Sequence, residues 1–198
     1  MNLSAKNILL LGVITLIGLG GLGLGLQFAF SDYDVMAFYR GYEPIWVQLF
    51  VGSIYGFIGA YLGWKIINMR FLQPVKEKYS GMIQQMNLTG WQVIFISICA
   101  GVGEEILFRG FIQDYLGIWL TALVFVAIHG YLNPKNSRIF VYGAFMTVVI
   151  AGLGYLTENT GIIAAMAAHT VIDIYLLKKL TQIESAKPAT IIVDDTEE

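Results

Sequence analysis

Apolar residues occur in long runs along this chain, and most of the charged residues lie outside these runs. A helix of about 20 apolar residues is long enough to cross the hydrocarbon core of a bilayer. We therefore predict an all-α, polytopic transmembrane helix bundle with about six spans, at residues 7–30, 44–68, 89–115, 116–131, 139–156 and 161–180. The fourth run is short, so we expect it to cross at a tilt or only in part.

The segment between the second and third runs has a different pattern. Apolar residues recur there at i, i+3 and i+4 spacing with lysines between them, at Leu72, Val75, Tyr79, Met82, Ile83 and Met86. This spacing predicts an amphipathic helix lying on the cytoplasmic surface of the membrane. Residues 1–180 are expected to form one transmembrane domain, and the polar residues 181–198 a disordered cytoplasmic tail.

The first run is too long for the apolar part of a secretory signal and is not followed by a small-x-small cleavage site, so we expect a retained helix. Gly18, Gly21 and Gly25 recur in it at three- and four-residue spacing. Such a stripe of small residues predicts close packing against another helix.

Composition and charge support a membrane protein. Hydrophobic residues make up 57% of the chain and charged residues 13%, and the single cysteine, Cys99, excludes an intrachain disulfide and is expected to be a buried thiol. The net charge of -2, without a dense basic cluster, excludes nucleic acid as an expected partner. In the six-span arrangement one side holds nearly all the basic residues: Lys6, Arg70, Lys76, Lys78, Lys135, Arg138, Lys178, Lys179 and Lys187.

The opposite side has Arg40 as its basic residue. Because cytoplasmic loops of membrane proteins are enriched in lysine and arginine, this distribution predicts that both termini are cytoplasmic.

Three charged residues lie inside the third apolar run, at Glu104, Glu105 and Arg109. A charged side chain at the centre of a bilayer costs about 2.5–3.5 kcal/mol on the insertion scale, so this cluster requires an explanation. In a helix Glu105 and Arg109 are i and i+4 neighbours, whereas Glu104 points about 100° away from Glu105. We therefore expect a paired carboxylate beside an unpaired one.

Both histidines of the chain also lie inside predicted spans. Phe125 and His129 are four residues apart, as are His169 and Asp173, so each pair shares a helix face. An isolated histidine in a membrane helix often serves only as a hydrogen-bond partner for another helix. Three such polar motifs on three different helices favour a functional site over this structural interpretation.

The motifs Glu104-Glu105-x-x-x-Arg109, Phe125-x-x-x-His129 and His169-x-x-x-Asp173 resemble those of the CPBP (Abi) family of intramembrane proteases. That family includes the type II CAAX prenyl endopeptidases and bacterial proteins tied to bacteriocin processing or self-immunity. The resemblance covers residues 89–180. The last motif usually ends in asparagine in the prenyl endopeptidases, and an aspartate in its place accepts hydrogen bonds but does not donate them when ionised.

The resemblance implies an endopeptidase that hydrolyses a peptide bond of a membrane-associated or lipidated peptide, in the plasma membrane of a bacterium. It implies that Glu104 activates a water molecule as the general base and that His129 holds this water. His169 would then stabilise the oxyanion, with Asp173 fixing its tautomer. The supporting residues are Glu105, Arg109 and Phe125.

A zinc-dependent version of this reaction uses the same side chains, with Glu104, His129 and His169 as the ligands and water in the open position. The sequence lacks the His-Glu-x-x-His helix typical of zinc proteases, so we favour a mechanism without a metal or other cofactor. The expected partners are the lipid bilayer and a peptide or lipidated protein C-terminus.

Two other functions stay open. One is a non-catalytic bacteriocin-immunity or scaffold protein that keeps the polar residues for structure. The other is a proton or ion carrier that uses Glu104, His129, His169 and Asp173 as a relay. The chain shows no internal repeat of the kind that many transporters contain, which weighs against the carrier.

Overall fold

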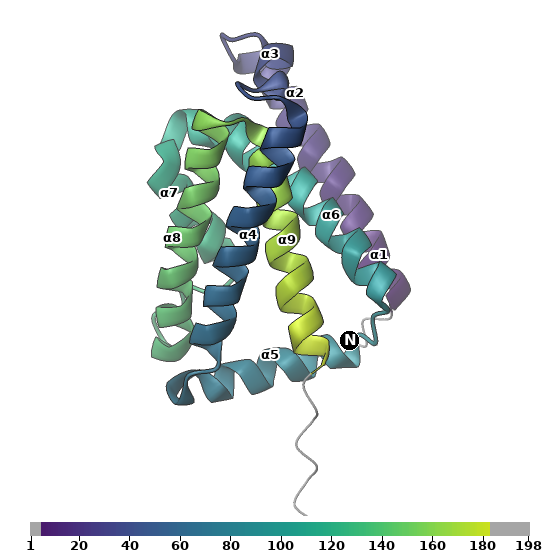
Figure 1. Cartoon of the computed structure of the whole chain (residues 1–198), viewed down its shortest axis with the longest axis vertical. Helices are drawn as coiled ribbons and strands as arrows, with labels where there is room; N and C mark the ends of the chain where they lie inside the picture. The colour runs from purple at the N-terminus through teal and green to yellow at the C-terminus, as the bar shows by residue number, and fades with distance from the viewer. Residues whose placement is uncertain (1–4, 183–198) are drawn as a thin grey trace, which may run out of the picture.

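The computed structural model describes residues 5–182, and these residues form helices joined by short loops, without a strand among them. Figure 1 shows α3 at one end of the helix bundle and α5 lying across the other end. The elements are α1 (Ala5–Ile14), η1 (Thr15–Leu19), α2 (Gly20–Phe30), α3 (Val35–Arg40), α4 (Ile45–Ile67), η2 (Arg70–Leu72), α5 (Gln73–Gln85), α6 (Gly90–Leu107), η3 (Phe108–Ile112), α7 (Gln113–Ile128), α8 (Ser137–Asn159) and α9 (Ile162–Thr181). The predicted all-α class is confirmed, and the tail predicted for residues 181–198 falls almost entirely outside the described residues.

Within residues 5–182, four helical stretches are long and apolar enough to cross a membrane: Lys6–Phe30, Ile45–Ile67, Gly90–Ile128 and Ser137–Asn159. The chain is therefore an integral membrane protein with several helical spans. The count of six spans stays a prediction, because α9 does not meet the same criteria of length and hydropathy.

The stretch Gly90–Ile128 is interrupted at Gly117, where the backbone has φ 67° and ψ 173°. A positive φ is accessible to glycine at little cost and ends the regular helical path. The interruption lies next to the predicted boundary between the third and fourth runs. The 11 helical residues that follow it rise about 17 Å, roughly half of a hydrocarbon core of about 30 Å. That the fourth run crosses at a tilt or only in part stays a prediction.

The surface of the bundle is apolar, and its interior contains polar groups. Large side chains such as Trp46, Phe57 and Trp119 are more than half exposed. Gln48 and Glu105, in contrast, are completely buried. This inverted distribution is expected for a protein whose solvent is lipid, where apolar side chains face outward and polar groups find partners inside.

The packing of the first helix corrects one prediction. A Cβ atom added to Gly21 or Gly25 would meet no heavy atom within 4 Å, and one added to Gly18 would meet only a neighbour in its own helical stretch. Gly20 and Gly23 face α6 instead, where a side chain on Gly23 would clash with the backbone of Leu107. The contact face is therefore the one that holds Gly20 and Gly23, which glycine spacing alone did not identify.

Helix α9 is held tightly between α4 and α6. A side chain on Gly52 or Gly56 of α4 would clash with the backbone of Ala164 or Ala168 in α9. On the other side, Gly101 of α6 lies against Thr170 of α9. These close backbone contacts fix the helix that contains His169 and Asp173 relative to the helix that contains both glutamates.

Helix α5 has the amphipathic character predicted for it. Leu72 in η2 and Val75 in α5 are buried, and Glu77 and Lys78 are exposed, whereas Met82, which was predicted on the apolar face, is about half exposed. The Ser80 hydroxyl donates to the carbonyl of Leu180 at 3.5 Å, so α5 is tied to the end of α9. Cys99 is buried, as predicted.

Candidate active site

Glu105 and Arg109 form the ion pair that their spacing predicts. The Arg109 Nε donates to the Glu105 Oε2 at 2.9 Å, and both side chains are fully buried. Arg109 lies in the π-helical turn η3, directly after α6, and its Nη2 donates to the carbonyl of Ile150 in α8 at 3.1 Å. The ion pair therefore links α6 and η3 to α8. Single π turns occur frequently at functional sites.

The other oxygen of Glu105 reaches His169. The His169 Nδ1 lies 2.9 Å from the Glu105 Oε1, and the ring is 5% exposed. A carboxylate only accepts hydrogen bonds, so the proton of this bond belongs to Nδ1. On the far side of the ring, the His169 Nε2 lies 3.6 Å from the Asp173 Oδ2, which is too long for a direct hydrogen bond. The contact that orients His169 thus comes from Glu105, and sequence spacing had pointed to Asp173 for this role.

Glu104 faces the second histidine. The His129 Nε2 lies 3.5 Å from the Glu104 Oε2, and among the described residues this buried oxygen has no hydrogen-bond partner. His129 follows the last residue of α7, and its Nδ1 donates to the carbonyl of Phe125 at 2.7 Å. The neutral ring therefore presents an unprotonated Nε2 to Glu104.

Phe125 separates the two imidazoles. Its ring stacks on that of His129 at a centroid distance of 4.5 Å and meets that of His169 edge-on at 5.5 Å. Phe125 is also buried against Phe108 of η3. It fixes the positions of both rings through packing, because its side chain has no polar atom.

A cavity of about 140 Å³, called here the histidine cavity, joins these groups. Glu104, His129, His169 and Asp173 all line it, so the predicted site residues come from three helical segments to one place. Its remaining wall consists of Phe125, Val126, Tyr131, Tyr142, Met146, Ile150, Ile172 and Leu176. Tyr131 and Tyr142 were not recognised from the sequence, where a lone tyrosine at the end of an apolar run gives no signal.

A second cavity of about 140 Å³ adjoins the first and shares Tyr131, Tyr142, Asp173 and Leu176 with it. The rest of this apolar cavity is lined by Trp64, Ile67, Val75, Tyr79, Ile83, Ile139, Leu177 and Leu180. It reaches α5, so the amphipathic helix forms part of its wall. Asp173 lies where the two cavities meet.

The zinc ligand set considered from the sequence consists of Glu104, His129 and His169. Among residues 5–182 no group of three histidine, cysteine, aspartate or glutamate side chains is arranged to hold a metal ion. The His169 Nδ1 is occupied by Glu105, and its Nε2 points toward Asp173. As placed, these side chains do not assemble into a zinc site.

Polar contacts continue from the Glu105–Arg109 ion pair toward the end of the bundle where α3 lies. Arg109 Nη1 lies 3.5 Å from Gln113 Oε1, and the Gln113 Nε2 donates to the Glu158 Oε1 at 3.1 Å. Gln113 follows Arg109 by four residues, a spacing that could have identified it as a helical neighbour. Glu158 is distant in sequence and gave no such signal.

Comparisons with known proteins match the segment that contains these residues. Residues 86–175 match the family model described as type II CAAX prenyl endopeptidase Rce1-like. The chain is also similar to the uncharacterized protein YpbD of Bacillus subtilis, at 36% identity over 83 residues, and the match spans less than half of either protein, 41% of each. No solved structure matches it. The matched segment holds all three polar motifs, and residues 86–175 are therefore similar to the type II CAAX prenyl endopeptidase Rce1-like family of membrane peptidases, over less than half of the chain.

Proposed function

We propose that this protein is an intramembrane endopeptidase in which Glu104 activates water to hydrolyse a peptide bond of a membrane-associated or lipidated peptide. The observation that supports this most directly is the Glu104 Oε2, a buried carboxylate oxygen without a hydrogen-bond partner among the described residues, in a cavity that also holds two imidazoles. Glu105 differs, because Arg109 and His169 occupy both of its oxygens.

Water is held between Glu104 and His129 in this proposal. The His129 Nδ1 donates to Phe125, so the neutral ring offers Nε2 as an acceptor, 3.5 Å from the acceptor oxygen of Glu104. A water molecule that donates a hydrogen to each acceptor has its lone pairs directed away from both, toward a substrate carbonyl carbon. Glu104 removes the proton as the oxygen attacks, and later gives it to the leaving amine.

His169 stabilises the oxyanion in this mechanism. Glu105 binds its Nδ1 at 2.9 Å, which leaves Nε2 as the atom that faces the histidine cavity. In the imidazolium form Nε2 donates a hydrogen bond to the negative oxygen of the tetrahedral intermediate. Asp173, 3.6 Å away, stabilises this imidazolium by its charge. Glu105, Arg109 and Phe125 position the ring.

The lining of the apolar cavity supports a proposal for the chemical class of the substrate. It adjoins the histidine cavity at Asp173 and is lined mainly by aliphatic and aromatic side chains. We propose that it takes a hydrocarbon chain or an apolar segment of the peptide, which places the bond to be cut beside Glu104. A site near α5 suits a cytoplasmic substrate in a bacterial plasma membrane, with both termini of the protease on the same side.

The test compares the wild-type chain with Glu104→Gln, which keeps the shape of the side chain and removes the base. Cleaved peptides are identified by mass spectrometry of membranes that contain either protein, and kcat/KM is then measured on the peptide found. We expect Glu104→Gln to fold normally and to lose about 10²–10⁴-fold in kcat/KM, the range typical of general bases. Glu43→Gln, an exposed acid away from both cavities, is the matched control and is expected to match wild type.

Equal peptide profiles for wild type and Glu104→Gln, with the biological effect retained, would favour a non-catalytic immunity or scaffold protein. Metal dependence is tested on the same preparation by metal analysis and by chelation. We expect activity to survive chelation. Stoichiometric zinc whose removal abolishes activity, and whose return restores it, would contradict the mechanism without a metal.

The ion carrier is disfavoured by Arg109. The guanidinium lies fully buried in the chain of contacts that leads from His169 through Glu105 and Gln113. A fixed positive charge on such a path opposes the passage of protons and metal cations. Ion flux in proteoliposomes that depends on His129, without peptide cleavage, would reverse this preference.

A further inference from the structure

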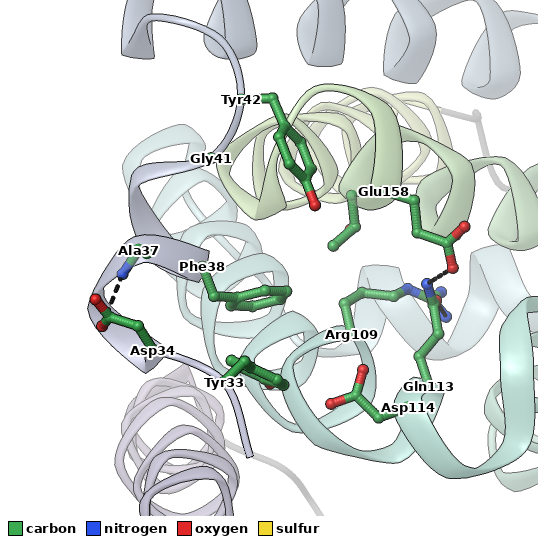
Figure 2. A pocket seen from close by; sticks show the side chains of 11 residues that line it. Tyr33, Asp34, Ala37, Phe38, Gly41, Tyr42, Arg109, Gln113, Asp114 and Glu158 are labelled. Carbon is green, nitrogen blue, oxygen red and sulfur yellow. Dashed lines mark hydrogen bonds between the residues drawn. The ribbon is translucent and has the colours of Figure 1, made fainter. Parts of the chain in front are cut away.

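A third cavity, of about 400 Å³, lies beside α3, at the end of the bundle opposite α5. We call it the α3 cavity. Figure 2 shows aromatic side chains from the segment around α3 facing polar side chains from η3, α7 and α8. The residues that define its character are Tyr33, Phe38, Tyr42, Gln113, Asp114 and Glu158. None of them lines the histidine cavity or the apolar cavity.

Hydrogen bonds hold the walls of the α3 cavity in place. The Tyr33 hydroxyl donates to the carbonyl of Gly110 in η3 at 2.7 Å. The backbone N–H groups of Tyr42 and Glu43 both donate to the carbonyl of Thr160, at 3.1 and 3.2 Å. The segment around α3 is thus attached to the bundle on both sides of the cavity. Its shape is defined by bonds to two other parts of the fold, and not by a loosely packed loop.

The cavity wall is negative. Asp114 and Glu158 line its mouth as exposed residues, and in the described part of the chain neither forms an ion pair with a basic side chain. Arg109 also reaches the cavity, but its charge is balanced by Glu105, and its Nη2 donates to Ile150. Gln113 is neutral and donates to Glu158. The two carboxylates therefore attract a cation that the described chain does not supply.

The opposite wall is aromatic. The rings of Tyr33 and Phe38 have centroids 5.4 Å apart, and Tyr42 points toward the same space in Figure 2. Ring faces attract ammonium groups within about 6 Å of the centroid, and a cluster of such rings recognises organic cations rather than bare metal ions. Asp34 contributes little, because its carboxylate caps α3 through the N–H groups of Met36 and Ala37.

We propose that the α3 cavity binds an alkylammonium group, specifically the side chain of a lysine, either free or within a peptide. The apolar stem lies against the rings, and the ammonium lies between Asp114 and Glu158. The proposal does not depend on the peptidase reaction, because the catalytic groups line a different cavity.

Binding is measured on the full-length chain in nanodiscs, by calorimetry and by saturation-transfer NMR. The probes are Nα-acetyl-lysine amide, Nα-acetyl-norleucine amide, which has a similar stem without the charge, and a short peptide with one lysine. We expect the lysine probe and the peptide to bind at least 10-fold more tightly than the norleucine probe. Asp114→Asn and Glu158→Gln are each expected to weaken lysine binding by about 10-fold, whereas Glu77→Gln, an exposed acid in α5 with the same loss of charge, leaves it unchanged.

Three outcomes would overturn the proposal: no binding of the lysine probe to wild type, equal binding of the lysine and norleucine probes, or unchanged binding in both Asp114→Asn and Glu158→Gln. A lipid source is distinguished by repeating the measurement in nanodiscs with and without phosphatidylethanolamine. If the lipid amine occupies the cavity and free lysine does not bind in either membrane, a lysine site is excluded. The melting temperature of each variant establishes that it is folded.

Discussion

The two acid and histidine pairs of this protein use the same chemical groups in opposite environments. Glu105 and His169 are 0% and 5% exposed and are held by a 2.9 Å hydrogen bond and by Arg109. The Glu104 and His129 side chains are 14% and 35% exposed, their contact is 3.5 Å, and one oxygen of Glu104 has no partner in the described chain.

This difference shows how adjacent glutamates can serve different purposes. A buried carboxylate with an arginine partner and two occupied oxygens is a poor base, because taking up a proton breaks its contacts. A partly exposed carboxylate with a free oxygen can bind water and accept a proton. In a helix the 100° step from Glu104 to Glu105 is enough to separate the two carboxylates. Glu104 and His129 form the partly exposed pair, called here the open pair, and Glu105 and His169 form the buried pair.

The largest effect is expected from replacing glutamate by glutamine in the buried pair of Glu105 and His169. Glu105→Gln leaves the guanidinium of Arg109 buried without a counter-charge, which typically costs about 3–5 kcal/mol. We expect low yields of folded protein and a markedly lower melting temperature, whereas Glu104→Gln stays within about 1 kcal/mol of wild type, as is usual for a substitution that breaks no buried pair. Thermal unfolding in detergent, followed by circular dichroism, measures both.

The double variant Glu105→Gln and Arg109→Gln tests the cause of that loss. It removes both charges, so it is expected to be more stable than Glu105→Gln alone, because the uncompensated cation is gone. If the two losses simply add, the ion pair is not the reason for the instability. Equal stability of Glu104→Gln and Glu105→Gln would remove the distinction between the two pairs.

An intermediate effect is expected in the open pair. His129→Ala removes the acceptor that helps to hold the water beside Glu104, and we expect kcat/KM to fall by about 10²-fold, the lower end for acid and base groups. The melting temperature should change little, since the ring is partly exposed. Unchanged kcat/KM would remove His129 from the proposed mechanism.

The smallest effect is expected at Asp173, where the related prenyl endopeptidases usually have asparagine. Glu105 already orients His169, so Asp173→Asn removes only a charge 3.6 Å from Nε2. We expect kcat/KM to change by less than about 10-fold, in line with a modest electrostatic contribution at a partly exposed group. A loss as large as that of Glu104→Gln would assign Asp173 a direct part in the reaction.

The sequence predicted well what depends on local spacing. The ion pair of Glu105 and Arg109 follows from i, i+4 geometry, and the amphipathic character of α5 follows from its periodicity. The break at Gly117 lies beside the predicted boundary between runs. Each of these features is determined within one or two helical turns.

What the sequence did not predict depends on which helices pack together. The bond from His169 to Glu105 joins residues 64 positions apart and exists because α9 lies against α6. The same dependence explains the glycines of the first helix, where Gly20 and Gly23 contact α6 and Gly21 and Gly25 do not. The α3 cavity is lined by residues from several segments of the chain, and no sequence motif indicates it.

The glycine contacts of α4 with α9 have a consequence for substrate entry. Gly52 and Gly56 bring the two backbones together so closely that separating them would open an empty slot along both helices. In the proposed peptidase, a peptide substrate in the lipid is therefore not expected to enter between α4 and α9. Helix α7, which ends directly before His129, packs mainly against α8, and its contact with Gly154 is made by the side chains of Gln113 and Ile118 rather than by its backbone. In the proposed peptidase, we therefore expect the segment to be cleaved to enter along α7, close to His129.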